Sequence, residues 1–202
     1  MSFKQDNYAV IRGLLSNELA EVAKNYLETK RDVYHCLLEH RMTHPAAVHN
    51  YWYYNKDVIQ NCYSTYGDVL MDSLLLRVKP VIEQETGLEL VETYSYTRIY
   101  YNGSELFRHK DRPACEVSLT MNLGGDPWDI FVEPSGETGK EGTRIALQPG
   151  DAVIYKGHLL EHWRERFEGE ECYQTFFHYS DKNGPYGEDH KYDFRPMLGF
   201  PE

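Results

Sequence analysis

Short strand-like segments separated by glycine and proline turns dominate the sequence after residue 88. They cover 88–101, 115–123, 128–134, 143–157 and 172–179. They end at turn signals such as Asn102-Gly103, or contain a tight turn such as Pro149-Gly150. Many short strands with this punctuation are typical of a β-sandwich or barrel. We therefore expect a mainly β protein with flanking α-helices packed outside the strands.

Helical patterns precede the β segments. Ser16 is placed to cap a helix, and the residues after it carry apolar side chains at three- and four-residue spacing. A second helix is expected over 68–86, with Asp68 as its N-cap. Gly87 would end this helix, and Pro80 predicts a kink within it.

The length of 202 residues suits one domain with a proper core. We divide the single domain 1–202 into a helix-rich N-terminal support at 1–87, a β core at 88–180 and a polar tail at 181–202. The aromatic segment 43–57 is expected to form a surface loop or a short helix.

Composition argues against several classes of partner. The net charge is −11 and no run is rich in lysine and arginine, which argues against binding to nucleic acid or to an anionic membrane. The most apolar run, 69–78, is interrupted by Asp72 and is too short to span a bilayer. The N-terminus lacks the apolar stretch of a secretory signal. Four cysteines without CxxC pairing predict reduced thiols in a cytoplasmic protein.

His109 and Asp111 stand two positions apart in the run ELFRHKDRPACE, residues 105–116. On an extended chain two such side chains point to the same face, so they can hold one metal ion together. The alternative is a surface ion-pair cluster with the neighbouring basic residues Arg108, Lys110 and Arg112. The pair alone is a weak signal, because a chain with nine histidines and twelve aspartates is about as apt as not to contain this spacing by chance.

A second imidazole is available behind a later strand. His162 lies 51 residues after Asp111, in the run GHLLEHWRERF, and His158 is the alternative in the same run. Two histidines and one carboxylate on one face of a metal leave coordination positions open, as non-haem Fe(II) oxygenases require. His178, on the last strand, is expected to be hydrogen-bonded inside the barrel.

The segments YYNGSELFRHKD and LQPGDAVIYKGHLLEHW resemble the 2-oxoglutarate/Fe(II)-dependent dioxygenases, in particular their prolyl-4-hydroxylase-like branch. The opening YAVIRGLLSNELAEVAKNYL is similar to their N-terminal strand and helix. The resemblance implies a double-stranded β-helix, or jelly roll, whose iron ligands are His109, Asp111 and His162. It also implies 2-oxoglutarate as cosubstrate, hydrogen-bonded by Tyr100, with O₂ as oxidant and ascorbate as a reductant.

The chain departs from this family after His162, the histidine that the resemblance implies as the distal iron ligand. Family members place a Lys or Arg about ten residues further on, to pair the C5 carboxylate of 2-oxoglutarate, whereas this chain has Glu170-Glu171-Cys172. A buried carboxylate needs a cation. We favour Arg166, followed by Arg164, because both alternate with His162 on an extended chain. Arg98 and Lys156 are further candidates.

The resemblance predicts hydroxylation of an unactivated C–H bond, with succinate and CO₂ as co-products. The substrate would be an amino acid, a peptidyl residue such as proline, or another small molecule. Arg112 and Glu116 flank the metal pair and are candidates to orient its charged groups. Two other functions stay open: a cupin-like metalloenzyme that does not use 2-oxoglutarate, and a non-catalytic jelly-roll binding module. The sequence does not indicate an oligomeric state.

Overall fold

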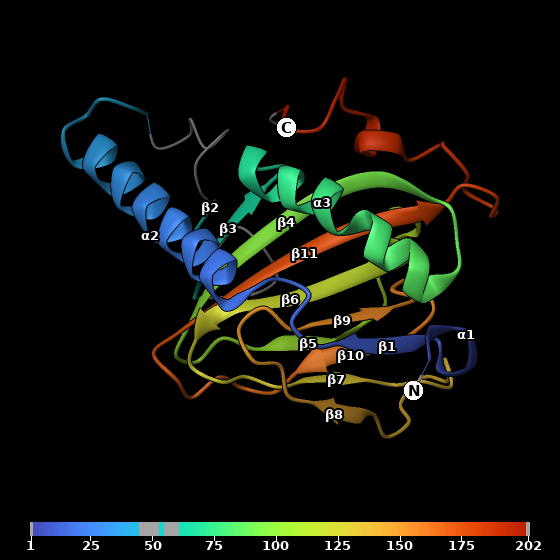
Figure 1. Cartoon of the computed structure of the whole chain (residues 1–202). Helices are drawn as coiled ribbons and strands as arrows, with labels where there is room; N and C mark the ends of the chain where they lie inside the picture. Colours follow the sequence, from blue (N-terminus) through green and yellow to red (C-terminus); the bar gives the residue numbers. More distant parts are fainter. Residues whose placement is uncertain (1, 45–52, 55–60, 201–202) are drawn as a thin grey trace.

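Two antiparallel sheets face each other in the computed structural model, which describes residues 2–44, 53–54 and 61–200 (Figure 1). The large sheet has the order β1-β9-β6-β11-β4-β3-β2. Its strands are β1 (Tyr8–Ile11), β2 (Tyr53–Tyr54), β3 (Cys62–Tyr66), β4 (Leu90–Tyr101), β6 (Val117–Gly125), β9 (Ala152–Tyr155) and β11 (Glu171–Asp181). The small sheet has the order β5-β10-β7-β8 and consists of β5 (Leu106–His109), β7 (Ile130–Val132), β8 (Thr143–Ile145) and β10 (His162–Arg164).

The two long helices cover the outer face of the large sheet, opposite the small sheet (Figure 1). Helix α2 (Asn17–Glu39) begins at Ser16, whose hydroxyl accepts a hydrogen bond from the backbone of Leu19. Helix α3 (Val69–Thr86) begins at Asp68, whose carboxylate accepts from two backbone N–H groups, and ends at Gly87 in the left-handed conformation. These caps satisfy groups that a helix end leaves unpaired, and they confirm the predicted helix ends.

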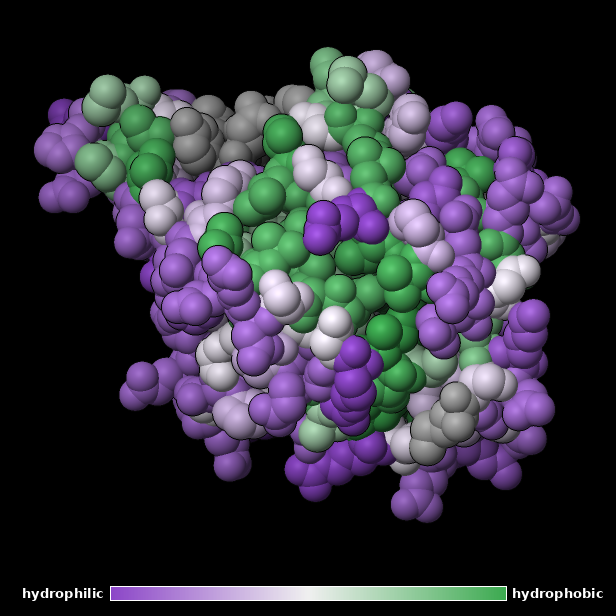
Figure 2. All heavy atoms as spheres, in the orientation of Figure 1, coloured by the Kyte–Doolittle hydropathy of each residue, from purple (hydrophilic) through white to green (hydrophobic). Residues whose placement is uncertain are grey.

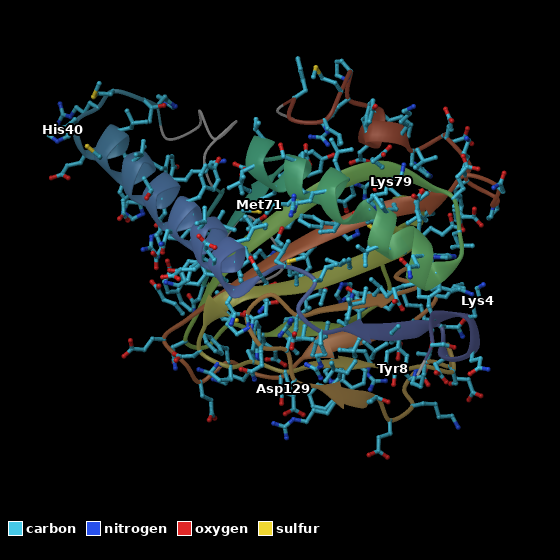
Figure 3. The ribbon with its side chains drawn as sticks, viewed as in Figure 1. Lys4, Tyr8, His40, Met71, Lys79 and Asp129 are labelled. Carbon is cyan, nitrogen blue, oxygen red and sulfur yellow. The ribbon has the colours of Figure 1, made fainter. Side chains whose placement is uncertain are left out.

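Apolar side chains of α2 and α3 pack on the large sheet and form the main core. Met71 of α3, labelled in Figure 3, is fully buried there, as is Leu27 of α2. In the space-filling view, hydrophobic side chains gather over the middle of this face and hydrophilic ones surround them (Figure 2). A second apolar cluster lies between the sheets and joins β1 and β9 to β7 and β8. The other half of the space between the sheets contains the candidate site.

Shorter elements complete the chain. They are α1 (Phe3–Asp6) and two short 3₁₀ helices, η1 (Pro113–Cys115) and η2 (Lys191–Phe194). None of the helices in the described ranges is long and apolar enough to cross a membrane.

The two-sheet architecture confirms the predicted mainly β jelly roll with flanking helices. One feature differs from the sequence-based division of the chain: the large sheet takes β1, β2 and β3 from before residue 88. The N-terminal part therefore contributes strands to the β core as well as helices that support it. Helix α3 runs through Pro80 as one helix. Most of the expected aromatic loop at 43–57 lies outside the described residues.

Candidate active site

Three predicted metal ligands meet between the two sheets. His109, at the end of β5, pairs in register with His162, at the start of β10, so two segments far apart in sequence bring their imidazoles together. The ring centroids are 4.3 Å apart. The Nε2 atom of each ring lies 3.5 Å from Oδ1 of Asp111. Ligand atoms of all three residues lie within 4.8 Å of one another, close enough to share one ion.

Hydrogen bonds fix the orientation of both imidazoles. Nδ1 of His109 lies 2.7 Å from the carbonyl oxygen of Phe107, and Nδ1 of His162 lies 3.1 Å from that of Leu160. A carbonyl oxygen only accepts, so each Nδ1 carries the proton and each Nε2 has a free lone pair. Metal-binding histidines are held by this same arrangement in proteins. The donor set therefore fits a divalent transition metal.

Neighbouring groups also orient the Asp111 carboxylate. Its backbone N–H donates to the carbonyl oxygen of Gly157 at 2.9 Å. Its Oδ2 accepts from the Ser118 hydroxyl at 2.9 Å, which leaves Oδ1 on the side of the histidines. The Ser118 hydroxyl lies a further 3.1 Å from Nδ1 of His178. A Cβ on Gly157 would lie 2.5 Å from Oδ2 of Asp111, so glycine is required for this close approach.

The charge balance keeps Asp111 ionised. Burial raises the pKa of Asp111, but His162 and His109 outweigh this effect and hold it well below its usual range. His178 behaves oppositely, because burial lowers its pKa to about 4. At neutral pH the site therefore contains an anionic carboxylate beside a neutral buried imidazole.

A cavity of about 240 Å³ opens beside the three ligands. Both sheets line it, with Tyr94, Tyr96 and Arg98 from β4, Phe176 and His178 from β11, Tyr155 from β9, and Leu106, His109, Asp111 and His162. Its wall is mostly aromatic, and Arg98 contributes the positive charge.

Arg98 is surrounded by aromatic rings. Its guanidinium carbon lies 4.8 Å from the centroid of Tyr96 and 5.9 Å from that of Phe176. Its Nη1 donates to the Tyr100 hydroxyl at 3.3 Å. In the register of β4 and β11, Arg98 stands directly opposite Gln174. At this pair of residues the positive charge is therefore on β4, and the side chain on β11 is neutral.

The other candidate cations lie elsewhere. Arg166 lies at a different cavity, which is lined also by Trp128 and Phe167. Arg164 is fully buried behind the site, where it donates to Gln174 Oε1 at 3.1 Å and to the Trp128 carbonyl. Burial lowers the pKa of Arg164, and its Nε has no hydrogen-bond partner among the described residues. The Lys156 ammonium lies over the ring of Phe3.

The remaining candidates have other partners. Tyr100 is fully buried and does not line the cavity, although it contacts Arg98. His158 lies 3.3 Å from the backbone oxygen of Glu116, so the structure brings His162 and not His158 to the pair. The Glu116 carboxylate accepts from the backbone of Asp181.

The basic neighbours of His109 and Asp111 do not form a surface cluster with them. Arg108 pairs with Glu161 at 2.9 Å, Lys110 donates to a backbone carbonyl, and Arg112 pairs with Asp193.

Among the residues of the site that sequence reasoning missed are Gly157 and Tyr155. The Tyr155 ring lies 4.6 Å from that of His162. A signal existed for Gly157, which directly follows the strand that contains Tyr155 and precedes the distal histidine. The alternation of Ser118 with Thr120 and Asn122 predicts a polar strand face that lines a pocket. The bond from Ser118 to Asp111 depends on the packing of β6 against the segment that contains Asp111.

No family model matches the sequence, and no curated protein matches it. Solved structures do match. A prolyl-4-hydroxylase from Pseudomonas putida has a TM-score of 0.64 and 13% identity, over 87% of this chain and 94% of that one. HygX from Streptomyces hygroscopicus, with nickel and 2-oxoglutarate bound, has a TM-score of 0.64 and 12% identity, over 88% and 84%.

The alpha ketoglutarate-dependent epimerase SnoN, from nogalamycin biosynthesis, has a TM-score of 0.64 and 18% identity, over 89% of this chain and 80% of that one. At these identities the likeness establishes the fold. The chain has the jelly-roll fold of the 2-oxoglutarate/Fe(II) oxygenases, prolyl-4-hydroxylase-like proteins among them, as its sequence predicts.

Proposed function

We propose that this chain is a non-haem Fe(II)- and 2-oxoglutarate-dependent dioxygenase that hydroxylates an unactivated C–H bond. The observation that carries the proposal is the convergence of two imidazole Nε2 atoms and one carboxylate oxygen beside a cavity that contains an arginine. His109, Asp111 and His162 would hold the metal on one side, which leaves its other positions open to ligands. Iron with 2-oxoglutarate and O₂ would supply the oxidising power, and the co-products would be succinate and CO₂.

Arg98 is the group we assign to the C5 carboxylate of 2-oxoglutarate. It lines the same cavity as the metal ligands, and an arginine fork binds a carboxylate through two hydrogen bonds. Tyr96, Phe176 and Leu106 exclude water around this pair, which strengthens it. Buried Arg164 adds positive charge behind Gln174.

Tyr100 acts through Arg98 in this proposal. It accepts from the guanidinium and holds it in place, whereas the resemblance had assigned it a direct bond to 2-oxoglutarate. This assignment places the cosubstrate cation on β4 instead of on β11. It supplies the cation that the sequence lacks after the distal histidine.

The substrate we propose is an amino acid, a peptidyl residue such as proline, or another small molecule, and ascorbate is a suitable reductant. The related solved structures include a prolyl-4-hydroxylase and an epimerase, so the reaction type within the class rests on our proposal. A cupin-like enzyme without 2-oxoglutarate would not need a cation in the cavity, and Arg98 argues against that alternative. A binding module would not need three oriented metal ligands.

Anaerobic addition of Fe(II) and then 2-oxoglutarate tests the proposal. We expect a weak visible charge-transfer band that requires both additions and is lost in His109→Ala. The matched control is His158→Ala, which removes a nearby imidazole that contacts Glu116 and Tyr186. Metal uptake without any response to 2-oxoglutarate would favour the cupin-like alternative. No stoichiometric metal uptake would leave only the binding module.

A further inference from the structure

The segment after β11 folds back toward the metal ligands through one ion pair. Arg112, the neighbour of Asp111, donates from Nη1 to Oδ1 of Asp193 at 2.7 Å and from Nη2 to Oδ2 at 2.6 Å. These two parallel bonds are the way in which an arginine binds a free carboxylate. The Asp193 side chain is mostly covered, whereas that of Arg112 is about half exposed, at 10% and 48%.

Two tyrosines complete the binding site for this carboxylate at the edge of the cavity. We call Arg112, Tyr66 and Tyr94 together the carboxylate seat. The Tyr66 hydroxyl donates to Oδ2 of Asp193 at 2.5 Å. The Arg112 guanidinium lies 4.7 Å above the ring of Tyr94, and Tyr94 stacks on Tyr66 at 5.0 Å. Tyr94 in turn lines the cavity and lies 4.5 Å from the ring of His178. One aromatic wall thus separates the carboxylate seat from the cavity beside the metal ligands.

The backbone that delivers Asp193 is strained. Tyr192, Asp193 and Phe194 have φ angles of +53°, +53° and +65°, and none of them is glycine. Consecutive left-handed residues of this kind are unfavourable and persist only when other contacts hold them. Phe194 is 76% exposed and so contributes little burial. The ion pair with Arg112 is therefore a main contact that holds this stretch against the protein.

Both ends of the stretch are anchored independently. Upstream, the backbone of Asp181 donates to the Glu116 carboxylate. Downstream, Arg195 pairs with buried Asp72 at 3.3 Å, and the backbone of Gly199 donates to the same carboxylate. Between these anchors, the Asp193 contacts and a ring contact of Tyr186 with His158 hold the stretch against the rest of the protein. We call residues 186–194, which lie between these anchors and include Asp193, the strap.

We propose that Arg112, together with Tyr66 and Tyr94, binds a carboxylate of the substrate, and that Asp193 occupies this seat until the substrate displaces it. The inference rests on the proposed function and narrows its substrate class to molecules with a free carboxylate, such as an amino acid or a peptide C-terminus. Exchange of one carboxylate for another leaves the charge balance at Arg112 unchanged. Arg98, which lines the cavity on β4, remains the residue that we assign to the cosubstrate.

The test uses the full chain, kept anaerobic, with and without Fe(II) and 2-oxoglutarate. The probes are N-acetylglycine and N-acetyl-L-proline, each compared with its primary amide, which has the same shape and no charge. Hydrogen–deuterium exchange of residues 186–194 reports on the strap. We expect both acids to speed exchange there by at least fivefold, and both amides to leave it unchanged.

Variants distinguish a site at Arg112 that can exchange Asp193 for another carboxylate from a permanent ion pair between Arg112 and Asp193. Asp193→Asn should bind the acids about fivefold or more tightly than the wild type, because the competing carboxylate is gone. Arg112→Gln should weaken binding of the acids about tenfold or more. Asp189→Asn, in the same stretch, is the matched control.

Three results would overturn the inference: equal effects of acids and amides, no displacement of the strap by either acid, or unchanged acid affinity in Asp193→Asn. Thermal unfolding of each variant shows whether it is folded. Hydrogen–deuterium exchange in the metal-free protein distinguishes failure of this inference from failure of the proposed oxygenase function. Acid-specific displacement without a charge-transfer band would support the seat and contradict the oxygenase, and a band without displacement would do the reverse.

Discussion

His109 and His162 face each other across the β5–β10 pair, with ring centroids 4.3 Å apart and both Nε2 atoms directed toward the same oxygen of Asp111. Two imidazole lone pairs and one carboxylate oxygen this close together repel one another. A shared divalent cation removes the conflict, because it accepts both lone pairs and neutralises the carboxylate.

Substitution of Asp111 by asparagine should weaken Fe(II) binding by at least ~100-fold, because a neutral amide replaces the only anionic ligand. His162→Ala should have a similar effect. Calorimetric titration of Fe(II) under anaerobic conditions measures both changes, and His158→Ala should bind as the wild type does. Equal loss in His158→Ala would mean that the distal ligand is misassigned.

Arg98 and Arg166 distinguish two positions for the cosubstrate cation. Arg98→Gln should raise the dissociation constant of 2-oxoglutarate by about 10- to 100-fold, since a charge-assisted hydrogen bond contributes about 1.5–3 kcal/mol. Arg166→Gln should change it less than about twofold, because Arg166 lies at another cavity. Titration of the charge-transfer band gives both constants, and Fe(II) binding without 2-oxoglutarate serves as the control. The opposite ranking would restore Arg166 as the cosubstrate residue.

Much of the fold was predictable because its signals are local. Ser16, Asp68 and Gly87 mark helix ends through their own side chains or backbone preferences, and the turns after residue 88 delimit the strands. Strand β3 was not predicted. It lies among helical patterns, and its place in the sheet depends on pairing with β4, from Cys62 opposite Tyr100 to Tyr66 opposite Tyr96. Pairing between distant segments leaves no periodic trace in the sequence.

The candidate site likewise contains some residues that local sequence signals suggest and others that only contacts between distant segments bring into place. The spacing of His109 and Asp111 is local, so the sequence could suggest them, and the resemblance added His162. Arg98 was only a secondary candidate, because its position opposite Gln174 is set by the register of β4 and β11. The contact between Arg112 and Asp193 spans 81 residues and could not be anticipated from either neighbourhood.

Gly157→Ala should disturb the metal site more than the fold. The new Cβ would lie 2.3 Å from Oγ of Ser118 and 2.5 Å from Oδ2 of Asp111, so the carboxylate must move. We expect Fe(II) affinity to fall by ~10- to 100-fold, the usual effect of disturbing the groups that orient a metal ligand. Calorimetry measures the affinity and thermal unfolding the stability.

Leu159→Ala, an exposed change in the same loop, is the matched control for Gly157→Ala. It should leave metal affinity unchanged. Wild-type metal affinity in Gly157→Ala would show that Asp111 does not depend on this close approach.

His178 should make the metal-free protein sensitive to mild acid. Its pKa is lowered to about 4 by burial, while in the unfolded chain it returns to the ordinary value of about 6.5. Between these two values the unfolded state takes up a proton that the folded state does not, so stability falls as pH falls from about 6.5 to 4. The contribution of this one group approaches ~1.4 kcal/mol per pH unit inside that window.

Urea unfolding of the metal-free protein at several pH values between 7 and 4.5 measures this dependence. His178→Gln should be less stable at pH 7, where it loses the contact with Ser118, but its stability should fall less steeply as the pH is lowered. His40→Gln, at the exposed end of α2 (Figure 3), controls for removal of an imidazole in general. If His178→Gln and the wild type lose stability in parallel, the ring is not held neutral in the folded protein.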